Sequence, residues 1–208
     1  MSKVGHSIGS LARVLMLVAL LGAGLAAPAG AGGFLDLVYA PATSQEGDFD
    51  GLADAPSMGF IFGYEAGILS TDMCFNVELG YETGTQEIDA LDDPDMYFRT
   101  HRGFLGLRLK YAGLGYIRPY FGGGVMAYAY YEASDDLAAL GVDDYEISKN
   151  LGGSYTVFGI DFSYAADSMV AFGIEQRNMK FTTKDEDTGD IEKDADVRRL
   201  ALKFNVRF

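Results

Sequence analysis

The last twelve residues of the chain read Val197-Arg198-Arg199-Leu200-Ala201-Leu202-Lys203-Phe204-Asn205-Val206-Arg207-Phe208. From Leu200 to Phe208 every second residue is large and apolar, and the residues between them are small, polar or basic. This period of two predicts a β-strand with one apolar and one polar face. In a soluble domain the apolar face would pack against a core, whereas in a membrane protein it would face lipid. The rest of the sequence distinguishes these two cases.

The start of the sequence is typical of an export signal. Lys3 and Arg13 are the only charged residues before the apolar run at 14–21, and small residues with A-x-A spacing follow at 27–31. A positive start, a short apolar centre and a small-residue exit describe a secretory signal peptide. The apolar run is shorter than the ~20 residues that a spanning helix needs. We therefore predict a signal peptide at 1–31 and a mature chain at 32–208.

Composition limits the class of the mature chain. The sequence of 208 residues is long enough for one domain, carries a net charge of −14 and contains a single Cys. One Cys in an exported chain cannot form an intramolecular disulfide. No long apolar run follows residue 31. A membrane protein without such a run must be a closed β-barrel, because lipid offers no hydrogen-bond partner to an open sheet edge.

Segments with a period of two recur along the whole mature chain. They lie at 33–40, 58–68, 73–82, 97–111, 117–132, 151–164, 169–181 and 197–208. Long acidic connections at 43–57, 84–96, 133–150 and 182–196 alternate with short ones at 69–71, 112–115 and 165–168. Outer membrane barrels combine an even number of strands with short periplasmic turns and longer extracellular loops. A soluble β-sandwich has no reason to keep this alternation. The order predicts an eight-stranded antiparallel up-and-down transmembrane β-barrel.

The mature chain resembles the eight-stranded barrel domains of outer membrane proteins A and X. The resemblance is carried by the closing strand that ends in Phe208 and by the run Pro119-Tyr120-x-Gly122-x-Gly124. It implies a location in the outer membrane of a Gram-negative bacterium. It also implies that the barrel-assembly machinery reads the terminal aromatic strand through Phe204, Val206 and Phe208.

Parity along the strands predicts which charged residues point into the lumen. If the aromatic-rich face meets lipid, the inward residues are Asp36, Glu65, Glu78, Glu82, Arg102, Arg108, Lys110, Asp161, Glu175, Arg177, Arg199, Lys203 and Arg207. An eight-stranded barrel is just wide enough for side chains to fill its interior, and an unpaired buried charge costs several kcal/mol. We expect an ion-pair network that seals the lumen, with a gated pore or a hydrophobic-ligand channel as the alternative. Strand pairing across 84–96 predicts that Glu78 meets Arg102, with Glu175 or Arg199 joining them.

The outward face should carry an interfacial girdle of Tyr, because the chain has no Trp. The expected members are Tyr39, Tyr64, Tyr81, Tyr111, Tyr155 and Tyr164. Glycines on the strands are expected to let a small barrel curve. The facing of 117–132 stays undecided, because residues 128–131 put aromatic side chains on both parities.

The sequence offers little for metal or catalytic chemistry. Carboxylates stand beside Gly at 48–51 and 185–190, but neither stretch matches a twelve-residue calcium loop. We therefore expect no cofactor and no specific metal site, only divalent cations shared between acidic loops and lipopolysaccharide phosphates. His101 is the only His of the mature chain and shares parity with Leu105, which faces it outward. Lipid A deacylases carry a His-x-Ser pair, whereas this chain reads His101-Arg102-Gly103.

The expected function follows from these observations. We expect a monomeric, non-enzymatic barrel that contributes to membrane integrity and to surface interactions through four acidic loops, in contact with outer membrane lipid and without nucleic acid. A narrow gated pore is the first alternative. A barrel enzyme that modifies lipid A or phospholipid with His101 is the second.

Overall fold

The computed structural model describes residues 32–48, 55–70, 72–88, 95–142, 144–147, 152–164, 168–185 and 192–208. The chain divides into two compact units, Met1–Gly32 and Gly33–Phe208, and the fold below is that of the second. The predicted signal peptide at 1–31 lies outside the described residues.

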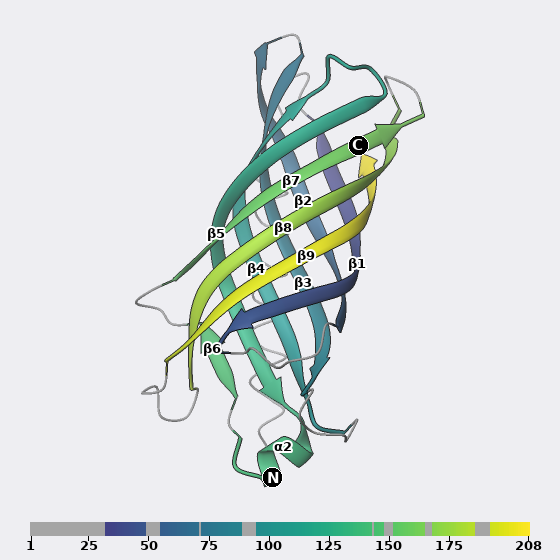
Figure 1. The fold of residues 1–208 in the computed structure, drawn as a ribbon. Helices are drawn as coiled ribbons and strands as arrows, with labels where there is room; N and C mark the ends of the chain where they lie inside the picture. Colours follow the sequence, from purple (N-terminus) through teal and green to yellow (C-terminus); the bar gives the residue numbers. More distant parts are fainter. Residues whose placement is uncertain are drawn as a thin grey trace. The chain divides into compact units, whose positions relative to one another are not determined.

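Strands dominate the second unit (Figure 1). They are β1 (Gly33–Gly47), β2 (Ala55–Ser70), β3 (Met73–Glu87), β4 (Tyr97–Tyr111), β5 (Ile117–Ala133), β6 (Tyr145–Ile147), β7 (Gly153–Ser163), β8 (Val170–Asp185) and β9 (Glu192–Arg207). All pairings are antiparallel, and the pairing of β1 with β9 closes the sheet on itself. A closed sheet has no open edge, as a bilayer requires.

The nine strands occupy eight positions in the wall. The short β6 and the longer β7 both pair with β5 on one side and with β8 on the other. They are therefore two pieces of one interrupted wall strand. The fold is an eight-position antiparallel up-and-down barrel, which confirms the fold class predicted from the sequence.

The strands extend beyond the predicted segments at the end that carries the long connections, called here the loop end. Strand β1 continues to Gly47, β3 to Glu87 and β8 to Asp185. The sequence analysis therefore placed the starts of the loops at 43–57, 84–96 and 182–196 too early in the chain. In this region polar residues occupy both faces, as with outward Ser44 and inward Gln45. The hydrophobic period fades there although the backbone pairing continues.

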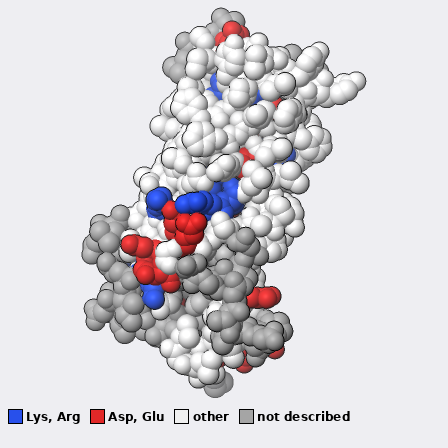
Figure 2. Space-filling view, viewed as in Figure 1, with Lys and Arg blue, Asp and Glu red and all other residues white. Residues whose placement is uncertain are grey.

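Burial in the barrel is the inverse of that in a soluble protein. Arg108 is 0% exposed, whereas Phe172 is 65% exposed and Leu200 is 59% exposed. On the face drawn in Figure 2, charged side chains gather mainly in one patch and leave much of the wall uncharged. An apolar exterior around a polar interior is the arrangement of a barrel that faces lipid. Among the described residues, no helix combines the length and apolarity needed to cross a bilayer.

A bulge in β5 settles the facing of 117–132. The pairing of β4 with β5 shifts where Gly103 faces Tyr128 and Phe104 faces Met126, so Ala127 is the extra residue. Before the bulge the even-numbered residues point inward, and after it Ala129 and Tyr131 are buried instead. The bulge therefore explains why aromatic residues occur on both parities.

A small apolar cluster lies at the loop end of the barrel. Helix α2 (Asp135–Ala139) begins at Ser134, whose hydroxyl accepts a hydrogen bond from the backbone N–H of Leu137. Leu137 is buried and belongs to the same core cluster as Phe98 and Tyr131. Leu137 therefore packs helix α2 against the inside of the barrel wall.

Candidate functional site: the charged lumen

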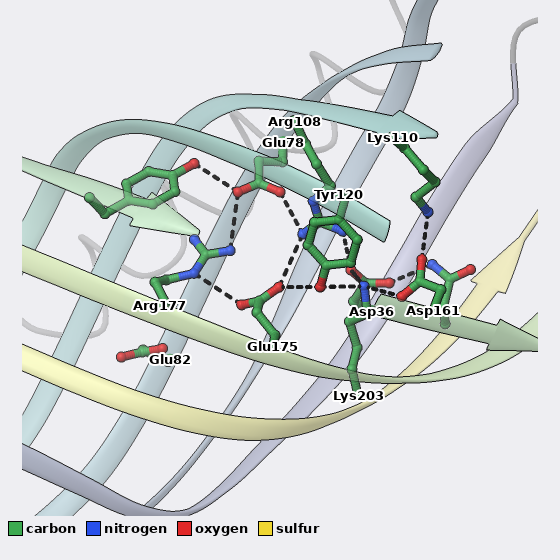
Figure 3. Close-up of polar contacts among 12 residues, drawn as sticks. Asp36, Glu78, Glu82, Arg108, Lys110, Tyr120, Asp161, Glu175, Arg177 and Lys203 are labelled. Carbon is green, nitrogen blue, oxygen red and sulfur yellow. Dashed lines mark hydrogen bonds and ion pairs between the residues drawn. The ribbon is translucent and has the colours of Figure 1, made fainter. Parts of the chain in front are cut away.

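One guanidinium connects three parts of the barrel wall (Figure 3). Arg108 extends inward from β4 and contacts Asp36 on β1 at 2.9 Å and Glu78 on β3 at 2.6 Å. It also contacts Glu175 on β8 at 3.4 Å. Since β8 is not a neighbour of β4 in the wall, this side chain crosses the lumen.

Arg177 forms a second junction beside Arg108. Its Nη2 lies 3.1 Å from Glu78, and its Nε lies 3.1 Å from Glu175. The Tyr155 hydroxyl donates to the same Glu78 oxygen at 2.7 Å. The guanidinium also stacks 3.8 Å from the centroid of the Phe104 ring. Two carboxylates and two guanidiniums thus form a closed ring of contacts, which compensates their loss of hydration.

Toward the loop end the network continues through Glu82. Its carboxylate pairs with Arg199 at 2.8 Å and with Arg102 at 3.3 Å. Arg199 also reaches Glu175 at 3.0 Å, which joins this layer to the central one. Beyond it, Arg102 donates to the side-chain oxygen of Gln45 at 3.2 Å, so the polar filling extends past the ion pairs.

In the opposite direction the network ends on two lysines. Lys110 and Lys203 each lie 2.6 Å from Asp161. Lys203 also lies 3.3 Å from Asp36, to which the Asn205 amide donates a hydrogen bond. Asp36 therefore links this layer to Arg108. The lumen ion pairs among the described residues therefore form one continuous network from Arg102 to Lys110.

Three solved structures are similar to this chain. The structure of neisserial surface protein A matches with a TM-score of 0.55 at 14% identity, covering 86% of this chain and 99% of that one. This is the fold of a small outer membrane β-barrel. OprG from Pseudomonas aeruginosa gives 0.47 at 13% identity (85% and 96% covered), and Ail of Yersinia pestis gives 0.48 at 12% identity (85% and 98% covered). No protein-family model and no curated protein sequence matches the chain.

All but two of the predicted lumen residues lie in this network. The members are Glu78, Glu82, Arg102, Arg108, Lys110, Asp161, Glu175, Arg177, Arg199 and Lys203, together with Asp36. The exceptions are Glu65 on β2 and Arg207 at the end of β9, which are half-buried and take no part in the ion pairs among the described residues. Parity placed Glu65 inward, but its position near the end of the strand leaves it outside the filled section.

The predicted pairing of Glu78 with Arg102 is wrong. Glu82 lies directly opposite Arg102, and Glu78 lies opposite Gly106. The prediction assumed that the connection spans 84–96, whereas β3 and β4 remain paired up to Glu87 and Tyr97. The strands are longer than their apolar segments, so the register differs by four residues. The sequence analysis expected Glu175 or Arg199 to join the network, and in the structure both lie in it, 3.0 Å apart.

Tyr155 does not belong to the interfacial girdle. Its side chain is buried, and its hydroxyl donates to Glu78 inside the lumen. The residue shares parity with Asp161, which is the signal that could have placed it. Tyr39 and Tyr111 do lie exposed on the outer wall, as predicted.

Glycines face aromatic rings inside the barrel. Four cross-strand pairs place a ring directly opposite a glycine: Phe34 with Gly63, Phe104 with Gly80, Tyr120 with Gly159 and Tyr155 with Gly124. A Cβ at any of these glycines would overlap the ring. The glycines therefore provide space for the rings as well as allowing curvature. Among the residues that sequence analysis did not place in the lumen, Tyr120 is central, because its hydroxyl bridges Glu175 and Lys203 at 2.9 Å each.

His101 faces outward from β4, on the other side of the wall from the network. Its Nδ1 lies 2.6 Å from the Tyr81 hydroxyl, and its Nε2 lies 3.9 Å from Glu132. Glu132 also pairs with Arg99 at 3.3 Å. No cluster of His, Cys, Asp and Glu able to hold a metal ion occurs among the described residues.

The terminal strand closes the barrel. The backbones of Phe208 and Gly33 exchange two hydrogen bonds of 2.9 and 3.0 Å, and the Phe208 ring lies 6.1 Å from the ring of Phe62. The rings of Phe204 and of Phe172 on β8 are tilted, with centroids 5.2 Å apart, and across the seam Phe204 lies opposite Leu37 and Val206 opposite Leu35 on β1. These contacts place the three predicted assembly residues along the seam between the two ends of the barrel. Their recognition by an assembly machinery stays a prediction.

Proposed function

We propose that this integral outer membrane barrel is a non-enzymatic protein with a sealed lumen, which contributes to membrane integrity and acts through its loop end. The observation that carries the proposal is Arg108, which bridges three strands across the interior. The proposed partners are the barrel-assembly machinery and the lipid and lipopolysaccharide of the outer membrane, and the proposed state is a monomer.

The energetics of the network favour a plug over a pore. A water path through the central layer requires Arg108 to leave at least one of its three carboxylates. Separating a buried ion pair costs about 3–5 kcal/mol, because each charge is left without its partner. Arg177 and Glu175 belong to the same ring of contacts, so opening disrupts several pairs together. The closed state is therefore strongly preferred over a gated one.

The charge at the loop end supports a role in surface interactions. Exposed acidic residues on the described parts of this end are Glu46, Asp48, Glu87, Asp95, Asp135, Asp136 and Asp194. Carboxylates crowded at one rim attract cations. A bound divalent cation can then be shared between these carboxylates and the phosphates of lipopolysaccharide. This supports the proposed contact with the outer leaflet through divalent ions.

Single-channel recording of the refolded barrel in a planar bilayer tests the sealed lumen. The wild type is expected to show no steady conductance. Removing two central side chains, with Glu78→Ala and Arg108→Ala together, is expected to produce conducting events. The matched control removes the exterior pair of Glu46 and Arg198, which lie 3.2 Å apart, and should stay silent. Steady conductance of the wild type would refute the plug and favour the gated pore.

A second candidate function has one observation in its favour. Tyr81, His101 and Glu132 form a hydroxyl–imidazole–carboxylate series on the outer wall. Such a series activates a hydroxyl nucleophile in acyl transfer. Release of fatty acid from lipid A by the wild type, abolished in His101→Ala and in Tyr81→Phe, would support the enzyme. The non-enzymatic proposal expects no release from any of the three proteins, measured by mass spectrometry of the lipid products.

A further inference from the structure

The outer wall of the barrel differs between its two sides near the loop end. On β3, β4 and β5 the outward residues there include an aromatic group, Tyr81, His101, Tyr128 and Tyr130, with the ion pair of Arg99 and Glu132 beyond it. On β7, β8, β9 and β1 they are polar or charged: Ser154, Gln176, Asn178, Lys180, Arg198 and Glu46. Aromatic girdles are the usual solution at a membrane interface. The polar side therefore needs a different partner at this level.

The outward residues along each strand show where this polar side lies relative to the exposed apolar band. On β8 the exposed apolar series ends at Ile174, and on β9 it ends at Leu200. Toward the loop end Lys180 and Arg198 come next among the outward charges. Arg198 thus stands directly beyond the exposed apolar series, and Lys180 lies further toward the loop end, after Gln176 and Asn178. This is the level of lipid headgroups.

Two exposed basic residues at this level, Lys180 and Arg198, take part in a group of ion pairs on the outer wall. Lys180 is 2.8 Å from Asp196, and Arg198 is 3.2 Å from Glu46 and 3.7 Å from Asp196. The side chains of Lys180 and Arg198 remain 73% and 52% exposed. Charged side chains of both signs gather on the face drawn in Figure 2. Exposed pairs of this kind contribute only about 0–1 kcal/mol, so an incoming anion can displace an acidic partner.

A groove of about 530 Å³ adjoins Lys180 on the same side of the barrel. Polar groups line it on three strands, including Ser154, Lys180, Thr182 and Asp194. The Thr182 hydroxyl donates to Asp194 at 2.7 Å. Hydroxyls and carboxylates suit the hydroxyl groups of a sugar, since each can donate to or accept from them. The acidic residues of the groove oppose a small free anion, so an anion needs additional contacts to stay there.

We propose that this groove, with Lys180 in its lining and Arg198 beside it through Asp196, binds the phosphorylated sugar headgroup of an outer-leaflet glycolipid. Arg198 and Lys180 contact the phosphate, and the groove receives the sugar. A guanidinium matches phosphate geometry with paired N–H donors. The acyl chains of the same lipid lie against the apolar band, which holds the headgroup at a high local concentration beside the groove. The inference rests on the outer membrane location and orientation given in the proposed function.

The test compares two lipid A probes on the refolded barrel in detergent, with binding counted by native mass spectrometry. One probe is bisphosphorylated lipid A, and the other is the same lipid with both phosphates removed. The double variant Lys180→Gln with Arg198→Gln should bind the bisphosphorylated probe at least about tenfold more weakly, as expected for loss of charge-assisted hydrogen bonds. The matched control is Arg99→Gln, which removes an outward base that pairs with Glu132 on the opposite, aromatic side.

Three outcomes would overturn the site. One is equal binding of the two probes by the wild type, and another is an equal loss in the Arg99→Gln control. The third is full displacement of the lipid by inorganic phosphate at matched concentration, which would identify a simple phosphate site. Heat-modifiable migration on electrophoresis verifies that every variant is folded. The assay does not measure conductance, so a failure here is distinguishable from failure of the sealed lumen.

Discussion

Glu78 is the position at which the lumen network is most sharply tested. Glu78→Gln keeps the shape of the side chain and removes its charge. The change takes a carboxylate from Arg108 at 2.6 Å and from Arg177 at 3.1 Å. One of the two carboxylate oxygens becomes an amide NH₂, which cannot accept a hydrogen bond. That oxygen is either the one that accepts from the Tyr155 hydroxyl or the one beside Arg108.

The expected loss is large because the site is fully buried. Breaking a buried ion pair by removing one partner costs about 3–5 kcal/mol. Both guanidiniums keep a second carboxylate on Glu175, which places the expected decrease in unfolding free energy near the lower end, about 3 kcal/mol. A surface substitution would change the same quantity by less than about 0.5 kcal/mol.

Double variants separate the ion pair from general disruption of the lumen. Adding Arg177→Met to Glu78→Gln removes the surplus base and retains apolar volume over the Phe104 ring. We expect this pair to recover about 1–3 kcal/mol relative to additivity, because the two residues are in contact. The control pair is Glu78→Gln with Arg102→Gln. Arg102 pairs with Glu82 and does not contact Glu78, so the coupling of these two losses should be clearly smaller than that of Glu78 with Arg177.

Urea unfolding of the refolded barrel in detergent micelles measures each free energy. Equal slopes against urea are needed, since a changed slope would mean a changed folded or unfolded state. Additive losses for Glu78 with Arg177, or strong coupling of Glu78 with Arg102, would refute the arrangement described for the lumen.

Three further predictions address packing, orientation and assembly. Gly80→Ala should destabilise the barrel by about 1–3 kcal/mol in urea unfolding, because the new Cβ overlaps the Phe104 ring, and adding Phe104→Leu should recover part of the loss. A Cys introduced at exposed Leu140 should react with a membrane-impermeant maleimide in intact cells, whereas one at exposed Leu114, on a short turn, should not; the reverse pattern would invert the barrel. Deleting Phe208 removes two hydrogen bonds at the seam and should lower the amount of heat-modifiable barrel in cells, whereas unchanged levels would argue against its role in assembly.

The period of two predicted facing well and register poorly, for a physical reason. Parity states which side of a strand a residue occupies, so Glu82 and Arg102 could be placed in the lumen from the sequence. Their mutual contact depends on where two strands begin to pair, which parity does not contain. Because β3 and β4 continue beyond their apolar segments, the error was four residues, an even number that preserves the facing.

Uncharged lumen residues were harder to recognise than charged ones. Tyr120 and Tyr155 have aromatic rings that suit either the lipid interface or the interior, and only their parity with Arg118 and Asp161 distinguishes the two. In β5 the even-numbered residues point inward before Ala127 and outward after it, because Ala127 is a bulge residue. The hydrophobic pattern of the sequence does not reveal this bulge. A glycine directly opposite an aromatic residue would have been a useful signal, but it requires the register to be known first.

Charge and ring packing together restrict the pairing of these strands. A slip of one residue between β3 and β4 would turn the charges of one strand toward lipid, at about 2–4 kcal/mol for each Arg near the bilayer centre. A slip of two would keep every charge inside, so burial alone does not prevent it. It would, however, place Phe104 opposite Glu78 or Glu82 instead of Gly80, and the ring would meet a long side chain where it now covers a backbone. The same slip would separate Glu82 from the directly opposed Arg102. The ion pairs and the glycine–aromatic pairs therefore select one register among those that the facing of the charges allows.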